Sequence, residues 1–294
     1  GITYFYTDLG VLRSLMLGSI VGGTSSAVVT TLVRQYPLTE RSRTILVLES
    51  AFSDVYTLAI PLTLLSAYKI GRFDVAYVTG QMIAAFLLAA MLGIAGAFLW
   101  SVLLNRMRTL QNTVFTTPAF VFIIYGIVEN LNYSGPIAAL LFGITLGNID
   151  VLGPPIMKNV ISRKPISLTG QERAFFSEAV FLLRTFFFVY IGISVRLQDW
   201  WMLAIGAIIT GALFLIRIPI VRLAVPRNTP PKDAAYMATM IPKGLGAAVL
   251  ASLPAQQGVP GGEIIQSVVF SIILFSTLFT TILTFLVDKT WISN

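Results

Sequence analysis

Long apolar segments alternate with short polar, glycine and proline interruptions along the whole chain. Several, such as 75–104 and 200–225, exceed the roughly 20 apolar residues that span a bilayer core of about 30 Å. The pattern predicts about nine spanning helices, near residues 9–34, 43–69, 74–104, 113–132, 135–148, 172–195, 199–225, 233–254 and 263–287. The proline-containing segment 149–171 predicts a loop with room for an interfacial helix. We therefore expect an all-α polytopic membrane protein.

Composition supports a membrane protein. The 294 residues are 56% hydrophobic and only 11% charged, whereas a soluble domain has roughly 25% charged residues. The mean hydropathy is +0.83, and no linker or low-complexity tract separates a soluble domain, so one membrane domain is expected over 1–294. Residues 1–7 lack the basic region and cleavage site of a signal peptide, so we expect the chain to begin within a longer protein.

The net charge of +7 is explained by where the basic residues lie. The odd-numbered loops between predicted helices contain twelve of them and the even-numbered loops contain three. The twelve are Arg34, Arg41, Arg43, Arg106, Arg108, Lys158, Arg163, Lys164, Arg173, Arg222, Arg227 and Lys232; the three are Lys69, Arg72 and Arg196. Because short cytoplasmic loops are enriched in Lys and Arg, we expect a cytoplasmic C-terminus. A nucleic-acid partner is not expected.

Two ionisable residues at similar depth suggest an ion pair. With a rise of about 1.5 Å per residue, Glu49 lies roughly 9 Å and Arg217 roughly 12 Å from the expected cytoplasmic ends of their helices. A charge inside the bilayer is costly unless it is paired or hydrated. We therefore expect Glu49 and Arg217 to form a supporting ion pair with a mainly structural role.

Asp54 is the acidic residue closest to the membrane centre, roughly 17 Å from the same helix end. Helical spacing places Ser50 and Thr57 on its face, and their oxygen atoms suit a hard monovalent cation. An intramembrane acid indicates an ion or proton path, although a buried Asp can also simply hydrogen-bond a neighbouring helix. The chain has no histidine, so proton chemistry near neutral pH must fall to carboxylates or lysines. It has no cysteine, so the sequence does not indicate a redox compartment.

Two predicted helices are interrupted at similar depth. Residues 22–26 (Gly-Gly-Thr-Ser-Ser) and 242–246 (Pro-Lys-Gly-Leu-Gly) each lie about 15 Å from the expected cytoplasmic ends of their helices, which run in opposite directions. Paired breaks of this kind indicate a secondary transporter with inverted repeats. Asp54 and Lys243 lie at this depth, where each can offset one set of half-helix dipole ends. Alternatively, the glycines merely allow close helix packing.

With these motifs in order, the chain resembles the monovalent cation/proton antiporter superfamily, which has the sodium/proton exchanger fold. Residues 49–54 are similar to its Glu-Ser-x-x-Asn-Asp motif, 129–135 to its Glu-x-x-x-x-Ser-Gly segment, and 186–192 to its Phe-rich helix ending in Gly. Arg217 and Lys243 stand where the family has helix-borne basic residues. Two positions differ: Ser53 replaces the usual Asn or Asp, and Thr24-Ser25-Ser26 replaces a frequent Thr-Asp-Pro.

The resemblance implies a cation/proton site and its assembly. Asp54 would bind a monovalent cation and a proton in competition, with Thr24 and Ser50 as further metal ligands and Ser53 and Ser25 beside them. Lys243 would be the helix-break charge, and no cofactor is expected. The family has about 13 helices and forms homodimers, so about four helices would precede residue 1. Core helices would lie at 9–69 and 199–287, and scaffold or linker helices at 74–195.

We therefore expect a secondary active transporter in the cell membrane that exchanges Na⁺, or else K⁺, for protons. A single acid at the site suggests electroneutral exchange. A same-fold carrier of another solute, such as an organic anion, and a non-transporting membrane sensor remain alternatives. An enzyme is not expected, because an aspartyl intramembrane protease needs two facing aspartates and a serine protease of the histidine type needs a histidine. The sequence does not fix the cation and assigns no role to Arg184.

Overall fold

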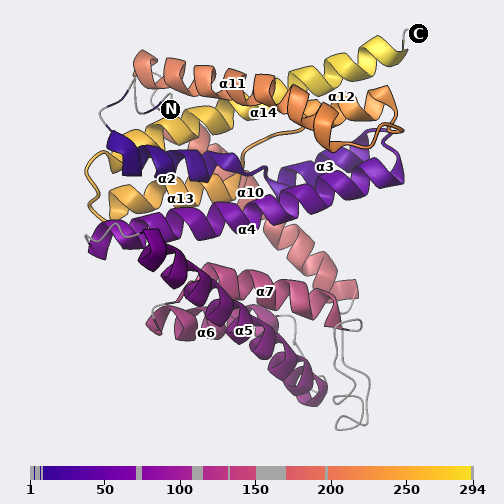
Figure 1. Cartoon of the computed structure of the whole chain (residues 1–294). Helices are drawn as coiled ribbons and strands as arrows, with labels where there is room; N and C mark the ends of the chain where they lie inside the picture. The colour runs from indigo at the N-terminus through magenta and orange to yellow at the C-terminus, as the bar shows by residue number, and fades with distance from the viewer. Residues whose placement is uncertain are drawn as a thin grey trace. The chain divides into compact units, whose positions relative to one another are not determined.

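The computed structural model describes residues 3, 7, 9–70, 75–107, 115–131, 133–149, 170–195 and 198–292. Regular structure in these ranges is entirely helical, which confirms the predicted all-α class (Figure 1). The predicted loop at 149–171 lies outside the described residues except at its two ends. The chain divides into two compact units, one of residues 1–72 and 186–294 and the other of residues 73–185.

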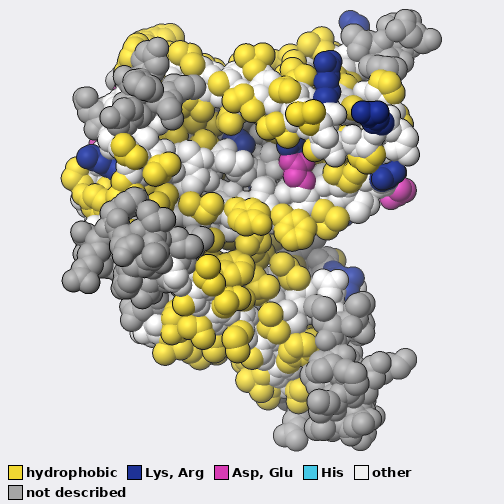
Figure 2. Space-filling view, viewed as in Figure 1, with side chains coloured by type: hydrophobic (Ala, Val, Ile, Leu, Met, Phe, Trp, Pro, Cys, Tyr) yellow, Lys and Arg dark blue, Asp and Glu magenta, His cyan; other side chains and the backbone are white. Residues whose placement is uncertain are grey.

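The helices match a protein that crosses a membrane several times. Six spans are long and apolar enough to do so, namely residues 10–35, 40–69, 86–104, 170–194, 200–224 and 262–289. Many large apolar side chains are exposed, for example Leu223 at 87%, Phe122 at 74% and Leu215 at 70%. Apolar side chains cover much of the visible surface in Figure 2. Exposed apolar area on this scale is unusual for a soluble monomer and suits contact with lipid.

The first unit contains most of the helices. They are α2 (Gly10–Gly22), α3 (Ser26–Gln35), α4 (Glu40–Ile70), the end of α10 (Gly170–Ser194), α11 (Trp200–Ala224), α12 (Pro231–Thr239), α13 (Leu245–Gln256) and α14 (Gly262–Ile292).

Two of the predicted spanning segments are each divided into two half-helices, as their glycine and proline patterns predicted. α2 ends where Gly23 becomes extended, with φ −84° and ψ 162°, and α3 begins after Ser25, which is also extended. α12 ends at Thr239 and α13 begins at Leu245. Pro242 lies in the second gap and lacks the N–H that a continuous helix requires.

α4 and α14 each extend beyond a predicted end. α4 begins at Glu40 rather than residue 43, because Thr39 caps it: its Oγ1 accepts a hydrogen bond from Ser42 N–H at 3.4 Å. α14 extends to Ile292 rather than residue 287, and Asp288 on this added turn bonds to α12. Hydropathy alone ends a helix where polar residues begin, so it missed both turns.

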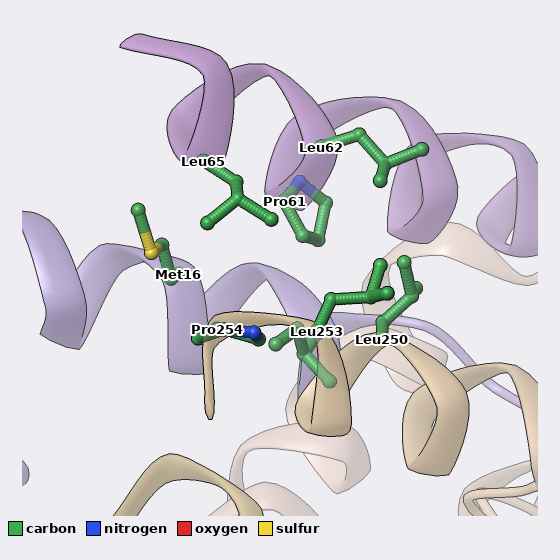
Figure 3. Close-up of a pocket in the computed structure, with 8 residues that line it drawn as sticks. Met16, Pro61, Leu62, Leu65, Leu250, Leu253 and Pro254 are labelled. Atoms are coloured by element: carbon green, nitrogen blue, oxygen red, sulfur yellow. The ribbon is translucent and has the colours of Figure 1, made fainter. Parts of the chain in front are cut away.

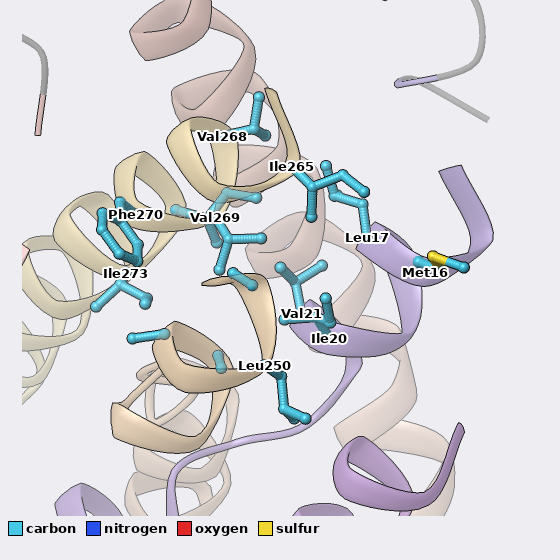
Figure 4. Packing of buried hydrophobic residues seen from close by; sticks show 14 of the residues in the cluster. Met16, Leu17, Ile20, Val21, Leu250, Ile265, Val268, Val269, Phe270 and Ile273 are labelled. Atoms are coloured by element: carbon cyan, nitrogen blue, oxygen red, sulfur yellow. The ribbon is translucent and has the colours of Figure 1, made fainter. Parts of the chain in front are cut away.

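Half-helices α2 and α13 pack on the unbroken α14. Their shared core includes Leu17 and Ile20 from α2, Leu250 from α13, and Ile265 and Val269 from α14, all at most 3% exposed (Figure 4). α11 approaches the same helix closely, since a Cβ atom added to Gly206 would lie 2.5 Å from Ser271 Cβ. Small residues at such contacts let helix backbones come close in membranes. α14 thus supports both half-helices.

The second unit contains α5 (Val75–Met107), α6 (Thr116–Asn130), α7 (Gly135–Gly147) and most of α10. Trp100 stacks on Phe120 at 4.6 Å and donates from Nε1 to Thr117 Oγ1 at 3.0 Å. Glu129 Oε1 accepts a hydrogen bond from Gly135 N–H at 2.9 Å, at the first residue of α7. The acid and glycine of segment 129–135 therefore join α6 to α7.

Candidate functional site

The two helix breaks meet backbone to backbone. Ser25 N–H donates to Pro242 O at 2.9 Å. The contact is tight, because a Cβ atom added to Gly244 would lie only 2.7 Å from Ser25 Cβ and closer still to its hydroxyl. Irregular backbone at membrane depth requires partners inside the protein, and here each break supplies one to the other.

Helix α4 contacts the whole length of the first break. Thr24 N–H donates to Ser53 Oγ at 3.0 Å, and the two side-chain hydroxyls are 3.1 Å apart. Ser26 N–H donates to Asp54 Oδ2 at 3.3 Å. At the other end, a Cβ atom on Gly23 would collide with the Thr57 hydroxyl. α4 therefore places its carboxylate and two hydroxyl groups directly against the extended segment.

Opposite charges lie at the two half-helix ends created by this break. Ser26 is the first residue of α3, so Asp54 lies at the positive end of that half-helix dipole. Gly23 O lies at the negative end of α2, where it accepts a 2.7 Å hydrogen bond from Lys243 Nζ. Lys243 is only 3% exposed. The arrangement balances both dipole ends with one anion and one cation.

The point where the two breaks meet is called the crossing below. Glu49 and Arg217 form an ion pair about one turn of α4 away from it. Both terminal guanidinium nitrogens, Nη1 and Nη2, donate to the carboxylate, with Arg217 Nη2 to Glu49 Oε2 at 2.6 Å. Arg217 Nε also donates to Met237 O of α12 at 3.2 Å. A bidentate pair of this kind is strong and geometrically specific. It connects α4, α11 and α12 beside the breaks.

The other hydroxyl groups singled out from the sequence have separate roles in the geometry. Ser50 is 1% exposed, and its Oγ donates to Val47 O in its own helix at 2.9 Å. Ser25 contributes its backbone N–H to the crossing and packs its side chain against Gly244. Ser53 and Thr24 bond to each other rather than to Asp54 in the described structure. They line the segment on either side of the carboxylate.

Sequence reasoning missed three groups at this site. Ser26 provides the N–H bonded to Asp54, Gly23 provides the carbonyl bonded to Lys243, and Ser276 Oγ accepts from Lys243 N–H at 3.1 Å. The first two lie at the edges of the predicted break, so the break itself was the available signal. Ser276 lies on a helix rich in hydroxyl side chains, where no pattern distinguishes it.

A second polar cluster, formed by α12 with α14 and the α3–α4 turn, was not predicted either. Asp233 is 3% exposed, and its Oδ2 accepts from Thr39 N–H at 3.1 Å and from Thr39 Oγ1 at 2.5 Å. Tyr236 Oη donates to Asp288 Oδ1 at 2.7 Å, and Lys232 Nζ lies 3.4 Å from the same oxygen. The cluster ties the start of α12 to its two neighbours.

A pocket between α2, α4 and α13 can be set aside as an ion site. It is lined by Met16, Ile20, Pro61, Leu62, Leu65, Leu250, Leu253 and Pro254 (Figure 3). None of these side chains has an oxygen atom, whereas hard cations are bound by oxygen ligands. The polar crossing is therefore the better candidate.

Two broken helices that cross inside the membrane region, with charged groups at their half-helix ends, are the architecture of a secondary ion transporter. Comparison with known proteins agrees: the chain belongs to the sodium/hydrogen exchanger family, whose transmembrane region matches residues 1–289. This confirms the resemblance to the monovalent cation/proton antiporter superfamily.

Individual relatives are distant. The K⁺/H⁺ antiporter NhaP2 of Shewanella sp. (strain ANA-3) is 25% identical over 285 residues, which cover 92% of this chain and 46% of the relative. NhaP2 of Shewanella oneidensis (strain MR-1) is 24% identical with the same coverage. The chain thus spans about half the length of these curated relatives. The sodium proton antiporter MjNhaP1 of Methanocaldococcus jannaschii has a similar fold, with a TM-score of 0.69 and 18% identity over 93% of this chain and 70% of that one.

Proposed function

We propose that this chain forms the ion-exchanging part of an antiporter that trades Na⁺ or K⁺ for protons. The observation that carries the proposal is the position of Asp54 at the N-terminus of α3, within the crossing of two broken helices. The family membership supports antiport, and the printed names of the relatives include both a K⁺/H⁺ and a sodium proton antiporter.

Asp54 is the residue that we expect to alternate between a proton and a cation. Its carboxylate accepts one backbone N–H, which leaves further lone pairs for a ligand. Thr24 and Ser53 hydroxyls line the adjoining segment, and Ser50 lies one turn away on the same helix. Carboxylate and hydroxyl oxygens suit a hard monovalent cation.

The proposed exchange is electroneutral. Near the crossing, Glu49 is held by Arg217 and Lys243 is bound to Gly23 O, so Asp54 is the carboxylate left to exchange ligands. One bound cation or one proton then neutralises the same single charge. Reconstituted protein that carries net current under both gradients would contradict this stoichiometry.

Movement and assembly complete the proposal. We assign the core helices at about 9–69 and 199–287 to the part that moves and the helices at about 74–195 to the scaffold of a homodimer. The distribution of Lys and Arg favours a cytoplasmic C-terminus. We place the protein in the cell membrane.

Transport by full-length protein in proteoliposomes tests the function. Proton flux is measured against Li⁺, Na⁺, K⁺ and Rb⁺ gradients for wild type, Asp54→Asn and Asp199→Asn. Asp199 caps α11 through Met202 N–H at 3.3 Å, and Asn caps as well as Asp, so that variant is a matched control. Asp54→Asn should abolish exchange and Asp199→Asn should retain it. Unchanged flux in Asp54→Asn would remove Asp54 from the mechanism.

A further inference from the structure

Helix α14 continues without a break past the gap between α12 and α13, and one of its hydroxyl groups reaches that gap. Lys243 N–H donates to Ser276 Oγ at 3.1 Å, and Ser276 Oγ donates in turn to Ile273 O at 3.1 Å. Ser276 is 1% exposed and Lys243 is 3% exposed. Water therefore does not compete for this hydrogen bond, and the hydroxyl is a fixed acceptor.

The gap needs such an acceptor because a buried, non-helical backbone leaves polar groups without helical partners. Met240, Ile241 and Lys243 are each at most 4% exposed. Met240 N–H and Ile241 N–H find acceptors within their own segment, in Tyr236 O and Thr239 O. Lys243 N–H instead depends on a side chain of a different helix.

The same lysine also supports the other broken helix. Its Nζ donates to Gly23 O at 2.7 Å, and the next residue, Thr24, is bound to Ser53 beside Asp54. Fixing the Lys243 backbone fixes the point from which its side chain extends to Gly23. A continuous series of contacts therefore runs from α14 through Lys243 to the segment that faces Asp54.

We propose that Ser276 is a positioning residue for the exchange site. Its hydroxyl sets the position of Lys243, and Lys243 in turn holds the carbonyl end of α2 against α4. Ser276 does not touch the transported ion. This inference rests on the proposed function of Asp54, and it adds α14 to the elements that determine how well the site binds its cation.

Thr277 provides a matched control for this role. Its Oγ1 donates to Ile273 O at 2.8 Å, the same carbonyl that Ser276 uses, but its described hydrogen bonds stay within α14. Ser276→Ala removes the acceptor of Lys243 N–H, Ser276→Thr keeps a hydroxyl, and Thr277→Val removes a hydroxyl that serves only α14. A purely local effect on the helix would appear equally in Ser276→Ala and Thr277→Val.

Amide hydrogen exchange in full-length protein tests the anchor directly. In Ser276→Ala, exchange at Lys243 should be faster by about tenfold, the factor expected for one buried hydrogen bond. Ser276→Thr and Thr277→Val should retain wild-type protection there. Equal protection of Lys243 in Ser276→Ala and wild type would overturn the anchoring role.

The dependence of cation/proton antiport on cation concentration tests whether Ser276 affects cation binding at Asp54. Ser276→Ala should raise the half-saturating cation concentration by about tenfold, and Ser276→Thr should restore it. If Ser276→Ala lowers only the melting temperature or the maximal rate, or behaves as Thr277→Val does, the positioning role is wrong. A wild-type protein without exchange would instead overturn the proposed function, and amide exchange would still decide whether Ser276 anchors Lys243.

Discussion

Lys243 Nζ donates a 2.7 Å hydrogen bond to Gly23 O, so a side chain from one broken helix caps the carbonyl end of the other. The partners are 220 positions apart in the sequence. A capped carbonyl end and a capped amide end, the latter at Asp54, allow two half-helices to end inside the membrane without exposed dipole charge.

Removal of the lysine ammonium should disrupt the crossing. Lys243→Met keeps the length of the side chain but leaves Gly23 O without its donor, so we expect loss of exchange together with a lower melting temperature. Lys232→Met is the control. Lys232 lies at the start of α12, far from the crossing, where it is partly exposed and 3.4 Å from Asp288 of α14. Full exchange activity in Lys243→Met would show that the ammonium is dispensable.

A methyl group at the crossing should prevent close approach of the two breaks. Gly244→Ala places a Cβ atom 2.7 Å from Ser25 Cβ, so the segments must separate and exchange should be lost. Gly246→Ala meets no atom within 4 Å and should behave as wild type. Gly244→Ala combined with Ser25→Gly removes the clash and should recover activity in proteoliposomes. A fully active Gly244→Ala protein would mean that the close contact is not required.

The ion pair of Glu49 and Arg217 should contribute mainly to stability. Glu49→Gln leaves Arg217 with an uncompensated charge, and we expect a loss of roughly 2 kcal/mol after allowing for the partial exposure of Glu49. Thermal melting in detergent measures it. Glu40→Gln breaks the exposed pair with Arg43 and should cost less than about 1 kcal/mol. Comparable losses in both variants would contradict a special role for the bidentate pair.

Ser53 should be replaceable only by a residue that retains an acceptor. Ser53→Ala leaves Thr24 N–H without its 3.0 Å partner, and the expected loss of stability is about 1–3 kcal/mol. Ser53→Asn supplies an amide oxygen and should lose less. Ser66→Ala is the control on the same helix, since that exposed hydroxyl bonds only to Leu62 O. If Ser53→Ala and Ser66→Ala exchange cations for protons at the same rate, Ser53 has no role in holding the break.

The sequence predicted the fold well because its signals are strong in a membrane. Apolar length defines the spans, and the glycine and proline residues near Gly23 and Pro242 interrupt two of them. Counting residues along each helix also placed Glu49 and Arg217 at similar depth. Because a charge in the bilayer needs a partner, the sequence predicted that they pair. Local chemistry and length were sufficient for these features.

The contacts of the site itself were less accessible from the sequence. Helical spacing gives the face on which Asp54 lies, but it does not say which backbone group crosses that face, so Ser26 was missed. Ser276 is one of several hydroxyl residues on α14, and only tertiary packing brings it to Lys243. The polar ends of α12 and α14 were missed for the same reason, because Asp288 and Tyr236 pair across different helices.

The distance in sequence between the two breaks also has a consequence for biosynthesis. A ribosome adds about 5–20 residues per second, so a nascent chain that contains Gly23 waits roughly 10–40 s before Lys243 is made. During that time the first break has no partner for its carbonyl end, and unsatisfied backbone is costly in lipid. We therefore expect α2 and α3 to reach their final membrane position only after α12 and α13 have been inserted, which makes closure of the crossing a late step of assembly.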